Sequence, residues 1–212
     1  MAAIPKRKLT AAEYLEIEGA AEFRSEFYDG EMYPLGGGPE AMAGGSRKHS
    51  VIATNFASAL HQRFKGGACQ VFNSDLRVNV SENGLYTYPD LSALCGTPQI
   101  RGVHGDTLLN PQLIVEVLSP STEAYDRGDK FRLYRELASL VEYVLVAQDR
   151  AFIMQYLREP DGTWRVAFVE GLDSTLSLRS VGVDVPLAEI YEKVQFGPEP
   201  GQAEATGTPE NG

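Results

Sequence analysis

The sequence predicts an α/β protein in which helices flank a mixed β-sheet. A run at residues 113–118, apolar apart from Glu116 and followed at once by Ser119-Pro120, is typical of a strand buried on both faces. An amphipathic helical pattern precedes this run at residues 46–64, and a second follows it at about residues 125–139. Further strand-like runs lie before and after these helices, and this order indicates a mixed sheet.

The N-terminal part is expected to contain a short helix and a hairpin. Thr10 is the expected N-cap of a helix over residues 10–18, and Glu13 completes its capping box. The pair Asp29-Gly30 interrupts an alternating pattern and predicts a hairpin turn.

The remaining elements follow from periodicity and turn residues. In chain order they are a glycine-rich mobile loop (36–45), a helix capped by Ser46 (46–64), two strands joined by a hairpin turn (69–80 and 85–95), a loop (96–110), the strand at 113–118, a helix (125–139), three strands (142–147, 151–157 and 163–169) and a short helix (187–194). We expect a single domain over residues 10–195, a flexible N-terminus over 1–9 and a disordered tail over 196–212.

The charge balance argues against one class of function. The 212 residues carry a formal net charge of −10, whereas proteins that coat nucleic acid are usually basic, because neutralised phosphates supply much of their affinity. A tight, nonspecific DNA-coating protein is therefore not expected. A local basic patch, or an acidic site balanced by bound cations, remains compatible with this composition.

Membrane insertion and secretion are not expected either. The chain has no apolar stretch of about 18 residues, the length of a membrane span. Its first eight residues lack the apolar core of a signal peptide. Cys69 and Cys95 follow no metal-ligand spacing, so we expect reduced, buried thiols in a cytoplasmic protein.

Glu116 is the most informative residue of the chain. It is the only charged residue in the run at 113–118, and a buried carboxylate is costly unless it is paired, hydrogen-bonded or bound to a metal. Glu116 therefore needs a partner. One reading is a purely structural residue in a buried salt bridge, and the other is a residue of a functional site.

Asp90 is the first candidate partner. It follows Pro89 at the start of an otherwise uncharged strand, and it faces Glu116 if the two strands are neighbours. Two close carboxylates repel each other unless a cation lies between them or one is protonated. A set of oxygen ligands suits Mg²⁺, with Mn²⁺ as a possible substitute. Judged alone, Asp90 could equally serve at a strand start or turn.

Lys130 is the second candidate. At 100° per residue it falls on the same helical stripe as Leu133, Tyr134 and Leu137, which should pack on the sheet. A lysine that faces inward beside carboxylates could orient a water or stabilise charge on a phosphate. Asp126, four residues earlier, could instead balance it locally, or its ammonium could reach past the sheet edge to solvent.

Several segments together resemble the Uma family of "putative restriction endonucleases", which belongs to the PD-(D/E)XK nuclease-like superfamily. The resemblance extends from about residue 10 to residue 194 and includes the hairpin and the helix of His49. The residues that carry it are Pro89-Asp90, Val115-Glu116-Val117-Leu118-Ser119-Pro120-Ser121-Thr122, Asp126, Asp129-Lys130, Tyr134 and Glu142-Tyr143-Val144-Leu145-Val146.

This resemblance implies a restriction-endonuclease-like fold, with an added N-terminal hairpin and C-terminal antiparallel strands. It implies that Asp90 and Glu116 bind a divalent cation, with the main-chain carbonyl of Val117 as a third protein ligand. It also implies hydrolysis of a phosphodiester in DNA by a metal-activated water. The superfamily's lysine should fall two residues after Glu116, where this chain has Leu118, and Lys130 would be its replacement.

Other residues are weaker candidates. Tyr134 could hydrogen-bond to a site carboxylate or a phosphate, His49 could line the site, and Glu26 could reach it as an auxiliary ligand. Taken alone, Tyr134 is more often a core residue, and His49 and Glu26 are more often surface residues. The best candidates for phosphate contacts lie near helix starts and are otherwise solvated surface residues: Arg47, Lys48 and Arg127.

The resulting hypothesis is a Mg²⁺-dependent endonuclease, in which a symmetric dimer would suit the two strands of DNA. Two alternatives stay open. One is a nuclease-fold binding module with little or no catalysis, which the displaced lysine and the acidic charge favour. The other is a phosphoesterase that acts on small molecules at the same site.

Overall fold

The computed structural model describes residues 7–35, 46–81, 84–102 and 105–197. The mobile loop expected at 36–45, most of the expected N-terminal segment and nearly all of the expected tail lie outside these residues.

The core of the protein is a six-stranded mixed sheet, which confirms the predicted fold class. Its strand order is β12-β11-β10-β9-β6-β3, and only the pair β9–β10 is parallel. The strands are β3 (Cys69–Asn73), β6 (Leu91–Cys95), β9 (Leu113–Val117), β10 (Glu142–Val146), β11 (Phe152–Arg158) and β12 (Trp164–Glu170). Every residue of β9 and β10 is buried, as expected for the strand that carries Glu116.

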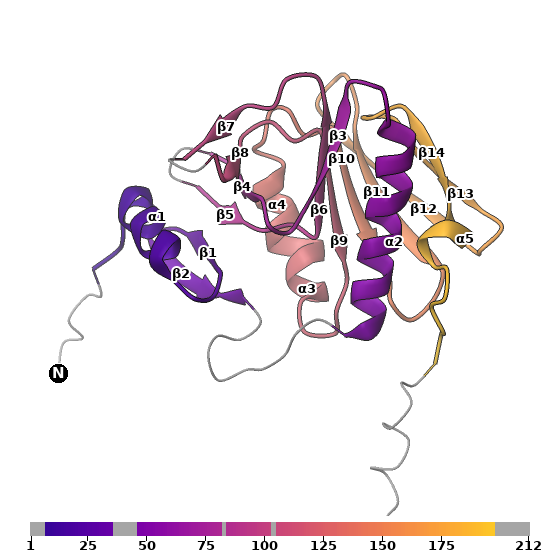
Figure 1. Ribbon diagram of the computed structural model, residues 1–212, viewed down its shortest axis with the longest axis horizontal. Coiled ribbons are helices and arrows are strands. Elements are labelled where there is room, and N and C mark those ends of the chain that lie inside the picture. The colour runs from indigo at the N-terminus through magenta and orange to yellow at the C-terminus, as the bar shows by residue number, and fades with distance from the viewer. Residues whose placement is uncertain (1–6, 36–45, 82–83, 103–104, 198–212) are drawn as a thin grey trace, which may run out of the picture.

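A long helix covers one face of this sheet. Helix α2 (Arg47–Phe64) begins where the Ser46 side chain accepts the backbone N–H of His49 at 3.1 Å. Its buried residues are Ile52, Phe56, Ala59, Leu60 and Phe64. The helix packs beside the hairpin of β13 (Thr175–Leu178) and β14 (Val183–Pro186) and the short helix α5 (Leu187–Ile190), as Figure 1 shows. The β13–β14 hairpin was not among the expected elements.

The opposite face carries a helical segment and a second sheet. The helical segment comprises α3 (Glu123–Tyr125), a π-helical turn (Asp126–Lys130) and α4 (Phe131–Tyr134). The second sheet has the order β2-β1-β5-β4-β8-β7. Its strands are β1 (Ser25–Tyr28), β2 (Glu31–Pro34), β4 (Arg77–Asn79), β5 (Tyr86–Thr87), β7 (Ile100–Arg101) and β8 (Thr107–Leu108). Helix α1 (Ala11–Ala20) lies beside β1, at the left in Figure 1.

Two local predictions at the N-terminus are confirmed. Thr10 and Glu13 form the capping box of α1. The hairpin of β1 and β2 turns at Asp29 and Gly30, which have φ angles of 47° and 80°. Two consecutive positive φ angles favour this residue pair in a tight hairpin turn.

The two long strands predicted at 69–80 and 85–95 are each broken in two, so this prediction is wrong in its boundaries. An Asx turn interrupts the first, because Asn73 Oδ1 accepts the backbone N–H of Asp75 at 3.1 Å. The second breaks before Asp90, where Pro89 cannot donate to a strand ladder. Consequently β3 and β6 pair in the central sheet, whereas β4 and β5 pair in the second one.

The helix predicted over 125–139 is also wrong in its detail. It begins at Glu123, passes through the π-helical turn and ends at Tyr134, so its last predicted residues form turns instead. The prediction that Lys130 and Tyr134 face inward is nevertheless confirmed, since both residues are buried. Single π-helical turns inside α-helices are frequent at functional sites.

The expectation of reduced, buried thiols is wrong. Cys69 and Cys95 are directly opposite each other on the antiparallel strands β3 and β6, and they form a disulfide. Both residues are half-buried. Because disulfides are typical of oxidising compartments, the thiol argument for a cytoplasmic location no longer applies, and that location stays a prediction. None of the helices in the described ranges combines the length and apolarity needed to cross a bilayer.

Candidate active site

The carboxylates of Asp90 and Glu116 meet at one edge of the pairing between β6 and β9. The antiparallel register places Leu91 opposite Val115, so Asp90 lies next to the end of β9. Asp90 Oδ2 accepts the backbone N–H of Val117 at 2.7 Å, and the Asp90 backbone N lies 3.4 Å from Glu116 Oε2. Asp90 and Glu116 are therefore neighbours on adjacent strands, as the sequence predicts.

Lys130 joins this pair from the helical segment. Its Nζ lies 2.8 Å from Glu116 Oε1 and 3.5 Å from the nearest carboxylate oxygens of Glu26 and Asp126. Only 6% of Lys130 and 5% of Glu116 is exposed. Lys130 thus contacts Asp126 on its own helical segment, as one of the predicted alternatives required. Its closer contact is with Glu116 on the central strand β9.

The electrostatics of the cluster show an excess of negative charge. Glu26, Glu116 and Asp126 surround one ammonium group. Burial raises the pKa of Glu116 to about 8, against the opposing effect of Lys130. Burial alone would lower the pKa of Lys130, but the surrounding carboxylates hold it well above its usual value. Burial also raises the pKa of Asp126.

Glu26 enters the cluster through the hairpin of β1 and β2. Strand β1 pairs with β5, and Thr87 at the end of β5 donates its hydroxyl to Glu26 Oε1. The hydroxyl of Tyr125 donates to Glu26 Oε2 at 3.1 Å. Thr87 and Tyr125 were not expected here. The only sequence feature that could have pointed to Thr87 is its hydroxyl group, three positions before Asp90.

Two predicted auxiliary residues hold the acids in place. Tyr134 donates its hydroxyl to Glu116 Oε1 at 2.9 Å, from the turn after Lys130. His49 Nε2 lies 3.0 Å from Asp90 Oδ2, at the start of α2 on the other side of the sheet. The hydrogen bond to Asp90 raises the pKa of His49.

The donor atoms suit a hard divalent cation. Asp90 and Glu116 supply carboxylate oxygens, and the carbonyl of Val117 faces the same side as its N–H, which Asp90 binds. Oxygen ligands and surplus negative charge are the features that Mg²⁺ prefers. No group of three or more His, Cys, Asp or Glu side chains suited to a metal occurs among the described residues, so the main-chain oxygen or water would have to complete the set.

The three basic candidates for phosphate contacts are placed differently. Arg47 and Lys48 directly precede His49 in the first turn of α2, and the Lys48 ammonium donates to the Gly197 carbonyl. Arg127 contacts Glu123 Oε1 at 2.7 Å and Met154 Sδ at 3.4 Å. Neither Glu123 nor Met154 belongs to the carboxylate cluster of Glu26, Glu116 and Asp126. Arg127 therefore does not contact the residues around Lys130.

The mixed α/β fold thus brings Asp90, Glu116 and Lys130 together at the end of β9. Residues 11–188 match the model of the Uma2 family, whose description is "Putative restriction endonuclease". The chain belongs to this family.

Relatives in cyanobacteria cover most of the chain. The uncharacterized protein slr1290 of Synechocystis sp. is 38% identical over 192 residues, which are 91% of this chain and 96% of that protein. A second uncharacterized Synechocystis protein, sll1609, is 33% identical over 163 residues, which are 77% of this chain and 88% of that protein.

A crystal structure shares the fold. A putative nuclease of the DUF820 family from Anabaena variabilis superposes with a TM-score of 0.66 at 19% identity, covering 86% of this chain and 97% of the other. At this identity the similarity shows the fold alone.

Proposed function

We propose that this protein is a divalent-cation-dependent endonuclease that hydrolyses phosphodiester bonds, with DNA as its substrate. The observation that carries the proposal is the contact of Lys130 Nζ with Glu116 Oε1 at 2.8 Å, beside Asp90 at the end of β9. Membership of a family described as restriction endonucleases supports the reaction class.

In this proposal Asp90, Glu116 and the Val117 carbonyl hold Mg²⁺ or Mn²⁺. A bound divalent cation of this kind lowers the pKa of a coordinated water and stabilises charge on phosphoryl oxygens. Tyr134 and His49 keep the two carboxylates oriented through their contacts at 2.9 and 3.0 Å.

Lys130 has the role that the superfamily assigns to a lysine two residues after the glutamate. Leu118 occupies that position here and is buried among apolar residues. The ammonium of Lys130 reaches the same carboxylate from the neighbouring helix, where it can orient a water or offset charge that develops on the phosphate. Glu116, Glu26 and Asp126 raise the pKa of this ammonium and keep it protonated.

Arg47 and Lys48 are proposed phosphate contacts, because they precede His49 in the first turn of α2. Arg127 is a weaker candidate, since its contacts are with Glu123 and Met154. A homodimer would offer one site to each strand of duplex DNA, and sedimentation in the presence and absence of DNA tests it.

The test is cleavage of supercoiled and linear DNA with Mg²⁺ or Mn²⁺, by the wild type and by Asp90→Asn, Glu116→Gln and Lys130→Met. Asp129→Asn is the matched control, because Asp129 adjoins Lys130 but is 72% exposed. The proposal expects cleavage by wild type and control and its loss in the three site variants. Equal cleavage by all five proteins would contradict it.

A second candidate function is binding of nucleic acid without hydrolysis. The observation that favours it is Leu118 at the motif's lysine position. Calorimetric titration with Mn²⁺ separates the two, since a binding module with no use for a metal takes up none at millimolar concentration. A small-molecule phosphoesterase would instead cleave aryl phosphates but not polymers.

A further inference from the structure

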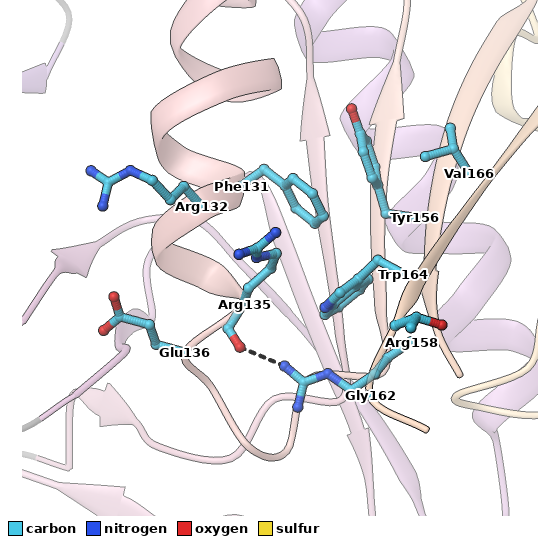
Figure 2. Close-up of a pocket in the computed structure, with 10 residues that line it drawn as sticks. Phe131, Arg132, Arg135, Glu136, Tyr156, Arg158, Gly162, Trp164 and Val166 are labelled. Atoms are coloured by element: carbon cyan, nitrogen blue, oxygen red, sulfur yellow. Dashed lines mark hydrogen bonds between the residues drawn. The ribbon is translucent and has the colours of Figure 1, made fainter. Parts of the chain in front are cut away.

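A second feature outside the carboxylate cluster is a cavity of about 680 Å³ between α4 and the strands β11 and β12. Figure 2 shows its lining, with aromatic rings that come from both the helix and the strands. Its main lining residues are Phe131, Tyr156, Trp164, Arg132, Arg135 and Arg158.

The aromatic residues form one continuous wall. The Phe131 ring centre lies 4.1 Å from that of Tyr156 and 5.3 Å from that of Trp164, the latter edge to face. Phe131 and Trp164 are only half-buried, and both line the cavity. Aromatic surfaces of this kind accept the flat faces of nucleobases irrespective of sequence.

The cavity is also cationic, although the chain as a whole has a net charge of −10. Three arginines and a single acid, Glu136, are among the described residues that line it. The Arg135 guanidinium lies 5.8 Å from the Phe131 ring centre, and that of Arg158 lies 4.9 Å from the Trp164 ring centre. The local excess of positive charge favours an anionic ligand.

The two guanidinium groups have different roles. That of Arg158 binds backbone carbonyls of the protein, whereas that of Arg135 can contact a ligand. Arg158 donates to the carbonyls of Arg135 and Leu137 at 2.7 and 2.9 Å, which ties β11 to the end of α4. Burial and the charge of Arg135 lower the pKa of Arg158. An anion bound at the Arg135 guanidinium would relieve this repulsion.

The cavity lies on the same face of the central sheet as Glu116. Tyr156 is opposite Tyr143 on β10, which is opposite Ile114 on β9. Ile114 and Glu116 are two residues apart, so their side chains share a face. Two strand spacings of ~4.8 Å separate β9 from β11, and Ile114 lies two residues along β9 from Glu116, so the cavity lies more than about 10 Å from the cluster.

We propose that this cavity binds an unpaired nucleotide of single-stranded nucleic acid, with the base against Phe131 and Trp164 and a phosphate on Arg135 and Arg132. This inference rests on the proposed function in one respect, namely that the bound single strand is also the substrate of the nuclease. Binding itself requires neither a metal nor hydrolysis.

Trp164 is the chain's single tryptophan, so its fluorescence reports on the cavity directly. The full-length protein, in EDTA, is titrated with a labelled thymidine oligonucleotide about 10 nucleotides long, within the site sizes of single-strand-binding folds. Trp164 quenching and label anisotropy are followed together. We expect both signals to saturate at the same concentration and to weaken as salt is added.

Two double variants with the same charge change test the arginines. Arg132→Gln with Arg135→Gln should weaken binding at least about tenfold and lower the salt dependence by about one unit of slope. Arg150→Gln with Arg165→Gln is the control, because both residues are exposed, and Arg165 follows Trp164 on β12 and points to the opposite face. Trp164→Phe keeps an aromatic face, so anisotropy should still report binding.

Four results would overturn the proposal. They are no oligonucleotide binding, binding without Trp164 quenching, equal weakening in the two double variants, and equal quenching by polyglutamate. The proposed nuclease activity fails separately, since a wild-type protein that binds oligonucleotide at Trp164 but cleaves no DNA contradicts only the activity.

Discussion

Lys130 Nζ lies 2.8 Å from Glu116 Oε1, and both side chains are almost completely buried. The π-helical turn that ends at Lys130 supplies the cation, and the central strand β9 supplies the acid. Asp126 and Glu26 flank the same ammonium at 3.5 Å. The stability of the protein and its proposed chemistry therefore depend on the same few atoms.

Replacing Lys130 should destabilise the protein as well as inactivate it. Lys130→Met leaves Glu26, Glu116 and Asp126 buried without their cation, and breaking such a buried pair costs about 3–5 kcal/mol. Denaturant unfolding at neutral pH measures this loss. Arg132→Met, on an exposed side chain of the same helix, is the control, and an equally small effect of both substitutions would contradict the account.

The stability of the metal-free protein should depend on the ionisation of Glu116. Its pKa is raised from 4.5 to about 8, so between these values the folded state holds more protons than the unfolded state. Stability should therefore fall as pH rises from about 5 to about 8, by at most a few kcal/mol. Unfolding in EDTA measures the trend.

Glu116→Gln is the informative variant for this pH dependence, because glutamine cannot ionise. The decline between pH 5 and 8 should become shallower in this variant. Lys130 does not account for the trend, since its pKa lies above this pH window in both states. The raised pKa of His49 contributes a further decline, which should remain in the variant. A wild-type stability that rises across the window would show that another group dominates.

Tyr134 should act by holding Glu116. Tyr134→Phe removes the hydroxyl that donates to Glu116 Oε1 at 2.9 Å, and loss of such a supporting contact typically lowers metal affinity 10–100-fold, so we expect about tenfold weaker Mn²⁺ binding. Calorimetric titration measures it. Tyr191→Phe is the matched control, since that hydroxyl bonds the Ala147 and Phe152 carbonyls instead. Indistinguishable Mn²⁺ affinities of the two variants would rule out this role.

His49 should act in the same way on Asp90. His49→Ala removes the contact of Nε2 with Asp90 Oδ2 at 3.0 Å, so DNA cleavage should fall about tenfold while the fold is retained. His61→Ala, near the other end of α2, should leave cleavage unchanged. If a higher Mn²⁺ concentration restores the activity of His49→Gln, His49 acts by positioning Asp90. Unaltered activity in His49→Ala would exclude any role of His49 in cleavage.

The central part of the site was predictable from local patterns. Glu116 stands out because no other charge interrupts its strand, and Lys130 stands out because it interrupts an inward apolar stripe. Both signals depend only on neighbouring residues. Burial of the strand and the inward direction of Lys130 are confirmed.

The rest depends on contacts between distant segments. Glu26 reaches the cluster only because β1 pairs with β5, and Cys69 meets Cys95 only because β3 pairs with β6 in that register. The π-helical turn cannot be read from a 3.6-residue period, which predicts a regular helix instead. Such pairings and irregular turns are set by tertiary packing.

A structure of crystals soaked in Mn²⁺ tests the central claim most directly, because the anomalous signal locates the ion. The account predicts a peak bonded to carboxylate oxygens of Asp90 and Glu116 and to the carbonyl of Val117, with the Lys130 ammonium beside it. The absence of a peak at millimolar Mn²⁺, or a peak held only by other residues, would contradict the account.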